Sequence, residues 1–139
     1  MINTNLVLAV VATGMIVAML FVTAVLKRQT RRKLNVEYYS KRWKDLQKLL
    51  GDPQTWPLAI IDADKLLDEA LKQTRVKGKT MGERLVSAQH ELSNNDAVWF
   101  AHKLRNKLVH EDYRKLKQGE VKDALMGFRQ ALKDIGALR

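Results

Sequence analysis

The first twenty-six residues form the most apolar part of the chain and carry no charged side chain. Within them, Leu6–Leu26 is a run of 21 uncharged, mostly apolar residues. A helix of that length spans about 31 Å, close to the thickness of the hydrocarbon core of a bilayer. A cleaved signal peptide would begin with basic residues and end in a small-residue cleavage site, but this run follows MINTN and ends in TAVLKR. The pattern therefore predicts a retained transmembrane helix.

A basic cluster follows this run directly. Residues 27–33, KRQTRRK, carry five positive charges and no negative charge. Basic residues beside a membrane span stay in the cytoplasm, so we expect the N-terminus outside and the rest of the chain in the cytosol. We interpret the cluster as a topology signal that also attracts anionic lipid, rather than as an RNA-binding arm. Residues 1–33 are thus expected to anchor a cytosolic domain of residues 34–139.

The segment LNVEYYSKRWKDLQKLL follows the basic cluster. Residues 34–50 predict a helix that ends at Gly51, and the prolines of DPQTWP predict a break after it. Three aromatic residues in this helix could lie at the lipid interface or pack on the domain, and the sequence leaves both alternatives open: Tyr38, Tyr39 and Trp43.

From Pro57 the apolar residues recur at spacings of three and four, which is typical of an amphipathic helix. Its expected inner face consists of Ile60, Ala63, Leu67, Ala70 and Leu71. Pro57 suits the first turn of this helix and Gly78 suits its end. Thr80 and Glu83 then form a capping-box pattern, which predicts a further helix to about Leu92.

Two more helices complete the expected domain. SNND at residues 93–96 predicts a turn and an N-cap, followed by a helix from about Asp96 to His110. The last helix is expected from about Gln118 to Ile135, with an inner face of Val121, Leu125, Phe128 and Leu132. No stretch alternates in the manner of a strand. The predicted fold class is all-α, with an N-terminal transmembrane helix followed by an antiparallel bundle of four or five helices.

The helix at residues 96–110 contains the densest group of functional side chains. On a regular helix, Ala97, Ala101, Leu104 and Leu108 form one stripe, which we expect to contact the core. A second stripe mixes valines with charged residues and consists of Val98, His102, Arg105 and Val109. This mixture predicts a half-buried surface that faces a partner helix, a second protomer or a ligand. Lys103 and Lys107 are expected to point to the far side.

His110 is turned about 140° away from Arg105 on a regular helix. The two side chains therefore diverge unless the helix ends near His110 or two protomers pair this face. Glu111 and Asp112, which come next, are a plausible place for the helix to loosen.

Composition limits the chemistry that this group can perform. The chain has no cysteine, so it has no disulfide, thiolate metal site or cysteine nucleophile. His90-Glu91 is not part of an HExxH motif, and no other residues have the spacing of metal ligands. The sequence also has neither a glycine-rich phosphate loop nor a serine nucleophile motif. No cofactor or metal is therefore expected. Residues 34–139 hold 20 basic and 15 acidic residues, a balance that favours a polyanionic partner.

The stretch Arg105-Asn106-Lys-Leu-Val-His110 resembles the R-x4-H motif of the HEPN family (higher eukaryotes and prokaryotes nucleotide-binding), in which a polar residue commonly follows the arginine. The order DADKLLDEALK, KTMGERL, AHKLRNKLVHE and a final amphipathic helix is similar to that of small bacterial HEPN domains. The resemblance covers roughly residues 57–139, the expected HEPN-like core. The commonest HEPN domains are soluble, and the expected N-terminal membrane helix is a departure from them.

This resemblance implies a homodimeric bundle, and many HEPN domains are metal-independent endoribonucleases with the motif at the dimer seam. The expected catalytic residues are then Arg105, Asn106 and His110, and the expected RNA contacts are His102, Lys103 and Lys107. A histidine can transfer the protons of a 2′-hydroxyl attack, and an arginine can stabilise the charge on the phosphoryl group. A toxin-like role with an antitoxin partner, at the bacterial inner (cytoplasmic) membrane, would fit this family.

Two other interpretations of the same residues stay open. Arg105 could pair with a carboxylate of the preceding long helix, namely Asp62, Asp64, Asp68 or Glu69, and His110 could simply stabilise a helix C-terminus. The domain would then be a non-catalytic, membrane-tethered module for dimerisation, partner recruitment or nucleotide binding.

Overall fold

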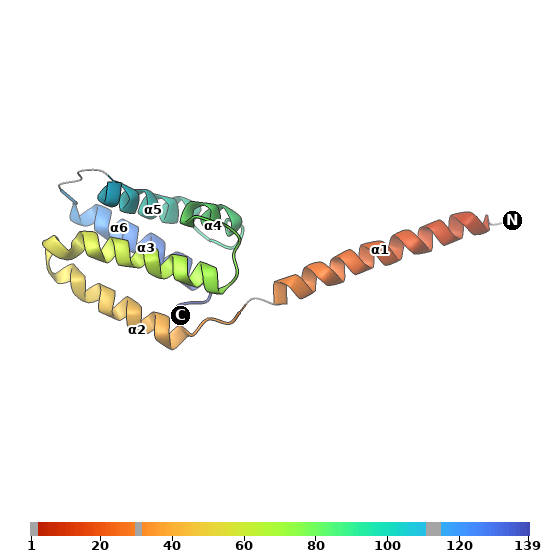
Figure 1. The fold of residues 1–139 in the computed structure, drawn as a ribbon, viewed down its shortest axis with the longest axis horizontal. Coiled ribbons are helices and arrows are strands. Elements are labelled where there is room, and N and C mark those ends of the chain that lie inside the picture. The colour runs from red at the N-terminus through yellow and green to blue at the C-terminus, as the bar shows by residue number, and fades with distance from the viewer. Residues whose placement is uncertain (1–2, 30–31, 111–114) are drawn as a thin grey trace. The chain divides into compact units, whose positions relative to one another are not determined.

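The structure is a computed structural model that describes residues 3–29, 32–110 and 115–139. The chain divides into two compact units, Met1–Arg31 and Arg32–Arg139. All regular secondary structure in the described residues is helical, as predicted. Figure 1 labels the six α-helices along the chain.

The first unit contains one long helix, α1 (Thr4–Gln29). Its segment Thr4–Leu26 is long and apolar enough to cross a membrane. No residue of that segment is buried, which distinguishes it from the core helix of a soluble protein. By length and composition the segment fits a membrane anchor or a signal sequence.

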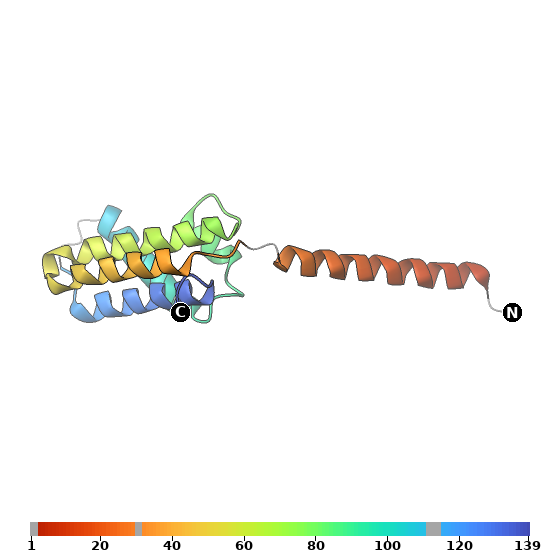
Figure 2. The same ribbon diagram turned by 90° about the horizontal axis from the view of Figure 1, so that it is seen from below.

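The second unit is a packed helical bundle in which the successive long helices reverse direction (Figures 1 and 2). Its elements are α2 (Val36–Gln47), two short 3₁₀ turns (Lys48–Gly51 and Pro53–Thr55), α3 (Trp56–Gln73), α4 (Met81–Ser87), α5 (Asn95–His110) and α6 (Gln118–Asp134). The four long helices surround one apolar core, and α4 is a short helix in the connection from α3 to α5 (Figure 1).

Helix α2 belongs to this core. Asn35 caps it by accepting a hydrogen bond from Tyr38 N, and its last expected turn is a 3₁₀ turn. Tyr39 and Trp43 are buried against the other helices, whereas Tyr38 is 38% exposed. Two of the three aromatic side chains therefore pack on the domain, and the hydrophobic core extends to Leu34, well before Pro57.

The end of α3 differs from the expected stop at Gly78. The helix ends at Gln73, and Arg75 adopts a left-handed conformation with φ of 60°. Gly78 has φ of 148°, and a Cβ atom there would lie 2.7 Å from the backbone nitrogen of Arg84. Glycine at position 78 therefore permits the loop to approach α4 rather than ending α3.

Helix α4 begins where the capping pattern predicts but is shorter than expected. The Thr80 hydroxyl accepts a hydrogen bond from Glu83 N at 3.2 Å. The Glu83 carboxylate accepts one from Lys79 N at 2.7 Å, one residue before the cap, so the reciprocal bond of a capping box is displaced. The helix ends at Ser87 rather than near Leu92.

Helices α5 and α6 approach each other closely at Gly127. A Cβ atom at this position would lie 2.5 Å from the carbonyl oxygen of Ala97. The inner face of α6 is the expected one, because Val121, Leu125, Phe128 and Leu132 are all buried. The close contact holds α5 against the core and leaves its opposite side free to carry polar groups.

Candidate functional site

The buried side chains of α5 lie between Val98 and Leu104, and the last turn of the helix is more exposed. Asn94 caps the helix, since its side-chain oxygen accepts a hydrogen bond from Ala97 N. In the stripe expected to be half-buried, Val98 and His102 are buried, Arg105 is partly exposed and Val109 is 47% exposed. The stripe taken as a whole is therefore half-buried, as predicted, with its first half in the interior and its second half towards solvent.

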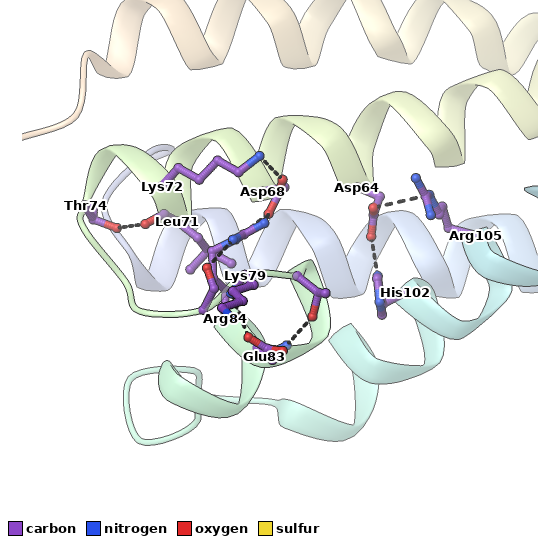
Figure 3. Close-up of polar contacts among 12 residues, drawn as sticks. Asp64, Asp68, Leu71, Lys72, Thr74, Lys79, Glu83, Arg84, His102 and Arg105 are labelled. Carbon is purple, nitrogen blue, oxygen red and sulfur yellow. Dashed lines mark hydrogen bonds and ion pairs between the residues drawn. The ribbon is translucent and has the colours of Figure 1, made fainter.

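His102 forms a buried pair with Asp64 of α3 (Figure 3). Its Nδ1 atom lies 2.7 Å from Asp64 Oδ1, and the side chains are only 9% and 4% exposed. A buried carboxylate needs such a partner, because an unpaired charge in the interior is costly. Asp64 is thus the centre of the site, although its sequence context did not distinguish it from three neighbouring carboxylates.

Arg105 also approaches Asp64. Its Nε atom lies 3.4 Å from Asp64 Oδ2, within ion-pair distance, but the geometry is not that of a hydrogen bond. Its Nη1 atom donates to the side-chain oxygen of Asn106 at 3.0 Å. The arginine side chain keeps 25% of its surface exposed.

Asn106 closes this network on His102. Because the Asn106 oxygen accepts from Arg105, its amide nitrogen faces His102 Nε2, at 3.3 Å. An amide nitrogen only donates, so Nε2 accepts and the proton of a neutral imidazole lies on Nδ1, directed at Asp64. Asp64, His102, Arg105 and Asn106, which we call the Asp64 network, therefore fix one another's orientation.

A cleft of about 520 Å³ opens beside this network, between α3, α4 and α5. Its lining consists of Asp64, Lys65, Asp68, Thr80, Met81, Gly82, His102, Arg105, Asn106 and His110. Arg105 and His110 both border this cleft. Glu111 and Asp112, where loosening was expected, lie outside the described residues.

The other expected substrate contacts are distributed differently. Lys103 and Lys107 are exposed and do not line the cleft. Lys65 of α3 does line it, and sequence analysis missed this residue. Asp64 borders the apolar stripe of α3 and is buried, whereas Lys65 lies on the exposed side of that helix, where the sequence pattern gives no signal that sets it apart from other solvated lysines.

A second carboxylate of α3, Asp68, forms a tighter cluster at the same cleft (Figure 3). Arg84 Nε donates to Asp68 Oδ1 at 2.7 Å, and Arg84 Nη1 donates to the Gly78 carbonyl at 2.6 Å. Lys72 pairs with the other Asp68 oxygen at 2.7 Å. We call Asp68, Arg84, Lys72 and Gly78 the Asp68 cluster; it ties the loop after α3 to α4.

The described residues contain no group of three or more histidine, cysteine or acidic side chains that could hold a metal ion. Comparison of the chain with protein-family models, with curated proteins and with solved structures finds no match. The resemblance to HEPN domains therefore stays a prediction.

Proposed function

We propose that the chain is a membrane-anchored, metal-independent endoribonuclease that acts as a homodimer. The observation that supports this most is the single cleft bordered by Arg105, Asn106 and His110, with Asp64 behind them. These residue types suffice for cleavage by the 2′-hydroxyl of RNA, which needs proton transfer and stabilisation of a phosphoryl charge.

Arg105 is the residue that would contact the scissile phosphate. Its Nε side faces Asp64 and its Nη1 atom is bonded to Asn106, whereas Nη2 makes no hydrogen bond in the described part of the chain. The guanidinium is thus held in one orientation with donors left for an anion. Fixed donors stabilise developing charge better than mobile ones, because they need no reorganisation during the reaction.

His110 is the residue that would move protons, because it borders the cleft and is exposed, unlike the buried His102. In the proposed reaction the 2′-oxygen attacks phosphorus and loses its proton to a histidine. The bond to the 5′-oxygen breaks, and that oxygen receives a proton. The products are a 2′,3′-cyclic phosphate and a 5′-hydroxyl, and the two histidines of a dimer would supply base and acid.

The exposed Val109 supports the dimer part of the proposal. It lies on the same side of α5 as Arg105, and 47% of its surface is exposed. An apolar side chain beside a polar cleft is a natural contact for a second copy. Pairing of this face would bring two Arg105 and two His110 side chains to one seam.

The direct test is incubation of residues 32–139, which contain the whole hydrophobic core, with single-stranded and structured RNA in excess EDTA. We expect cleavage that leaves 2′,3′-cyclic ends and that falls by about 100-fold or more in His110→Ala. His90→Ala is the matched control, since His90 is exposed and outside the cleft. Absence of cleavage between pH 6 and 8, or full activity in His110→Ala, would refute the proposal.

A second candidate function is a non-catalytic module for dimerisation, partner or antitoxin recruitment, or nucleotide binding. The observation that favours it is the proximity of Asp64, which offsets the charge of Arg105. In this case Arg105→Ala would weaken the dimer in sedimentation experiments, and neither the variant nor the wild-type protein would cleave RNA. RNA cleavage that disappears in His110→Ala while the dimer persists would decide for the enzyme.

The anchor is tested independently of the cleft. We propose that Leu6–Leu26 stays in the bacterial inner membrane as a single span, with residues 34–139 in the cytosol and RNA near the membrane as substrate. A C-terminal reporter active only in the cytosol should then be active and should sediment with membranes. Release of the reporter as a shortened, soluble protein would identify a signal sequence instead.

A further inference from the structure

A second concave surface lies on the other side of the bundle, between α2, the start of α3 and α6. It is a groove of about 560 Å³ and shares no residue with the cleft described above. Its apolar lining consists of Trp43, Leu50, Trp56, Val121, Leu125 and Met126, and its polar lining of Gln47, Gln118, Lys122 and Arg129, with Gly119 between them. This size and this composition are typical of small-molecule sites.

The charge of the groove is one-sided. Its lining contains Lys122 and Arg129 but no acidic residue. Both cations are exposed, and neither forms an ion pair within the described ranges. They are seven residues apart on α6, which places them on one face about 10 Å apart. An occupant with two separated negative charges would therefore meet both.

The floor of the groove favours a flat ring system. Trp56 is held in place by a hydrogen bond from its Nε1 atom to the Leu50 carbonyl, at 3.1 Å. Trp43 is 6% exposed, and its Nε1 atom has no hydrogen-bond partner in the described structure. Met126 completes the rim with 60% of its surface exposed. Indole and thioether groups pack well against aromatic rings.

We propose that this groove binds a small, planar aromatic anion that carries two negative groups. The rings would pack between the tryptophans and Met126, and the anionic groups would pair with Lys122 and Arg129. The inference does not depend on RNA cleavage, since no residue of the groove belongs to the cleft.

The experiment uses the full chain in lipid nanodiscs, labelled with 5-fluorotryptophan, and the probe is 1,5-naphthalenedisulfonate. Three fluorine resonances are expected, because the chain has three tryptophans. The signals of Trp43 and Trp56 should shift saturably with a Kd on the order of 0.1 mM. Trp99, which does not line the groove, is the internal control and should not shift.

Two pairs of variants complete the test. Arg129→Glu should weaken binding of the probe roughly 10-fold. Its control is Lys133→Glu, which makes the same charge change at an exposed position of α6 outside the groove and should leave binding unchanged. Gly119→Leu should obstruct the groove without a clash, since nothing lies within 4 Å of a Cβ there; Gly51→Leu, equally open but outside the lining, is its control.

Several results would overturn the inference. They are equal shifts of all three tryptophans, no shift up to 10-fold above the expected Kd, an equal response to inorganic sulfate, or equal binding by Arg129→Glu and Lys133→Glu. If Gly119→Leu fails to fold, as judged by circular dichroism, the charge variants still decide.

Discussion

Asp64 and Asp68 lie one turn apart on α3, and each faces an arginine from a later helix, yet the two arginines are held very differently. Arg84 is 5% exposed and contacts Asp68 through Nε at 2.7 Å and Nη2 at 2.6 Å. Arg105 contacts Asp64 only through Nε, at 3.4 Å, and its side chain is 25% exposed.

The difference separates a structural role from a functional one. Every nitrogen of the Arg84 guanidinium has a protein acceptor, because Nη1 binds the Gly78 carbonyl. Arg105 borders the cleft, and its Nη2 atom makes no hydrogen bond or ion pair in the described part of the chain. A guanidinium whose N–H donors are all hydrogen-bonded within the protein stabilises the fold and has few donors left for a ligand. A guanidinium that is held in one orientation but keeps free donors can bind an anion.

The largest effect on stability is expected for Arg84→Ala. It leaves Asp68 without its buried partner and frees the Gly78 loop, so the free energy of unfolding should fall by about 3 kcal/mol. Urea unfolding of residues 32–139 measures it. If Arg84→Ala lowers the free energy of unfolding less than Arg105→Ala does, the assignment of Arg84 to structure and Arg105 to function is wrong.

The second-largest effect is a dependence of stability on pH, caused by Tyr39, a buried residue outside the Asp64 network and the Asp68 cluster. Burial, with a smaller contribution from Glu69, raises the pKa of Tyr39 to about 12 from an ordinary value of 10.0. Between pH 10 and 12 the folded chain keeps this proton while the unfolded chain loses it, so stability falls as pH rises.

This loss should be of the order of 2 kcal/mol across that window. Comparison with Tyr39→Phe in urea unfolding at pH 9 and pH 11.5 isolates it, since the variant lacks the hydroxyl. An identical pH response of the two proteins would contradict the prediction.

Arg105→Ala should cost only about 1 kcal/mol of stability, because the ion pair is long and partly exposed and Asp64 keeps His102 as a partner. The same substitution should lower RNA cleavage by about 100-fold or more. Arg42→Ala, an exposed arginine of α2, serves as the control in both assays. A variant that loses folding and activity in parallel would assign Arg105 to structure.

The smallest effect is expected for Lys72→Ala. Its ion pair with Asp68 has a length of 2.7 Å, but the lysine side chain is 60% exposed. Exposed pairs of this kind contribute about 0.5 kcal/mol or less, and salt screens them. Thermal unfolding at low and high salt tests this, and a loss comparable to that of Arg84→Ala would show that the Asp68 cluster is not dominated by its arginine.

The sequence was sufficient to predict that the domain is helical and where most of its helices lie. The 3.6-residue period located α3, α5 and α6, and the inner faces of α3 and α6 with them, because a helix in a bundle must bury one apolar stripe. On α5 it missed that Val98 and His102 are buried. Local capping placed the start of α4 at Thr80. The sequence rules failed at helix ends: α3 ends at Gln73, two residues before the left-handed Arg75, and α4 ends at Ser87, although neither place has the glycine that usually signals a helix end.

The site shows the same division. The sequence indicated Arg105, Asn106, His102 and His110 from their spacing on one helix. That Asp64 is the partner of His102 and Arg105 became clear from the fold alone, because the choice among four carboxylates of α3 depends on how α3 and α5 pack. Burial of His102 beside an exposed His110 was decided in the same way, since the packing of the two helices sets how far burial extends along α5.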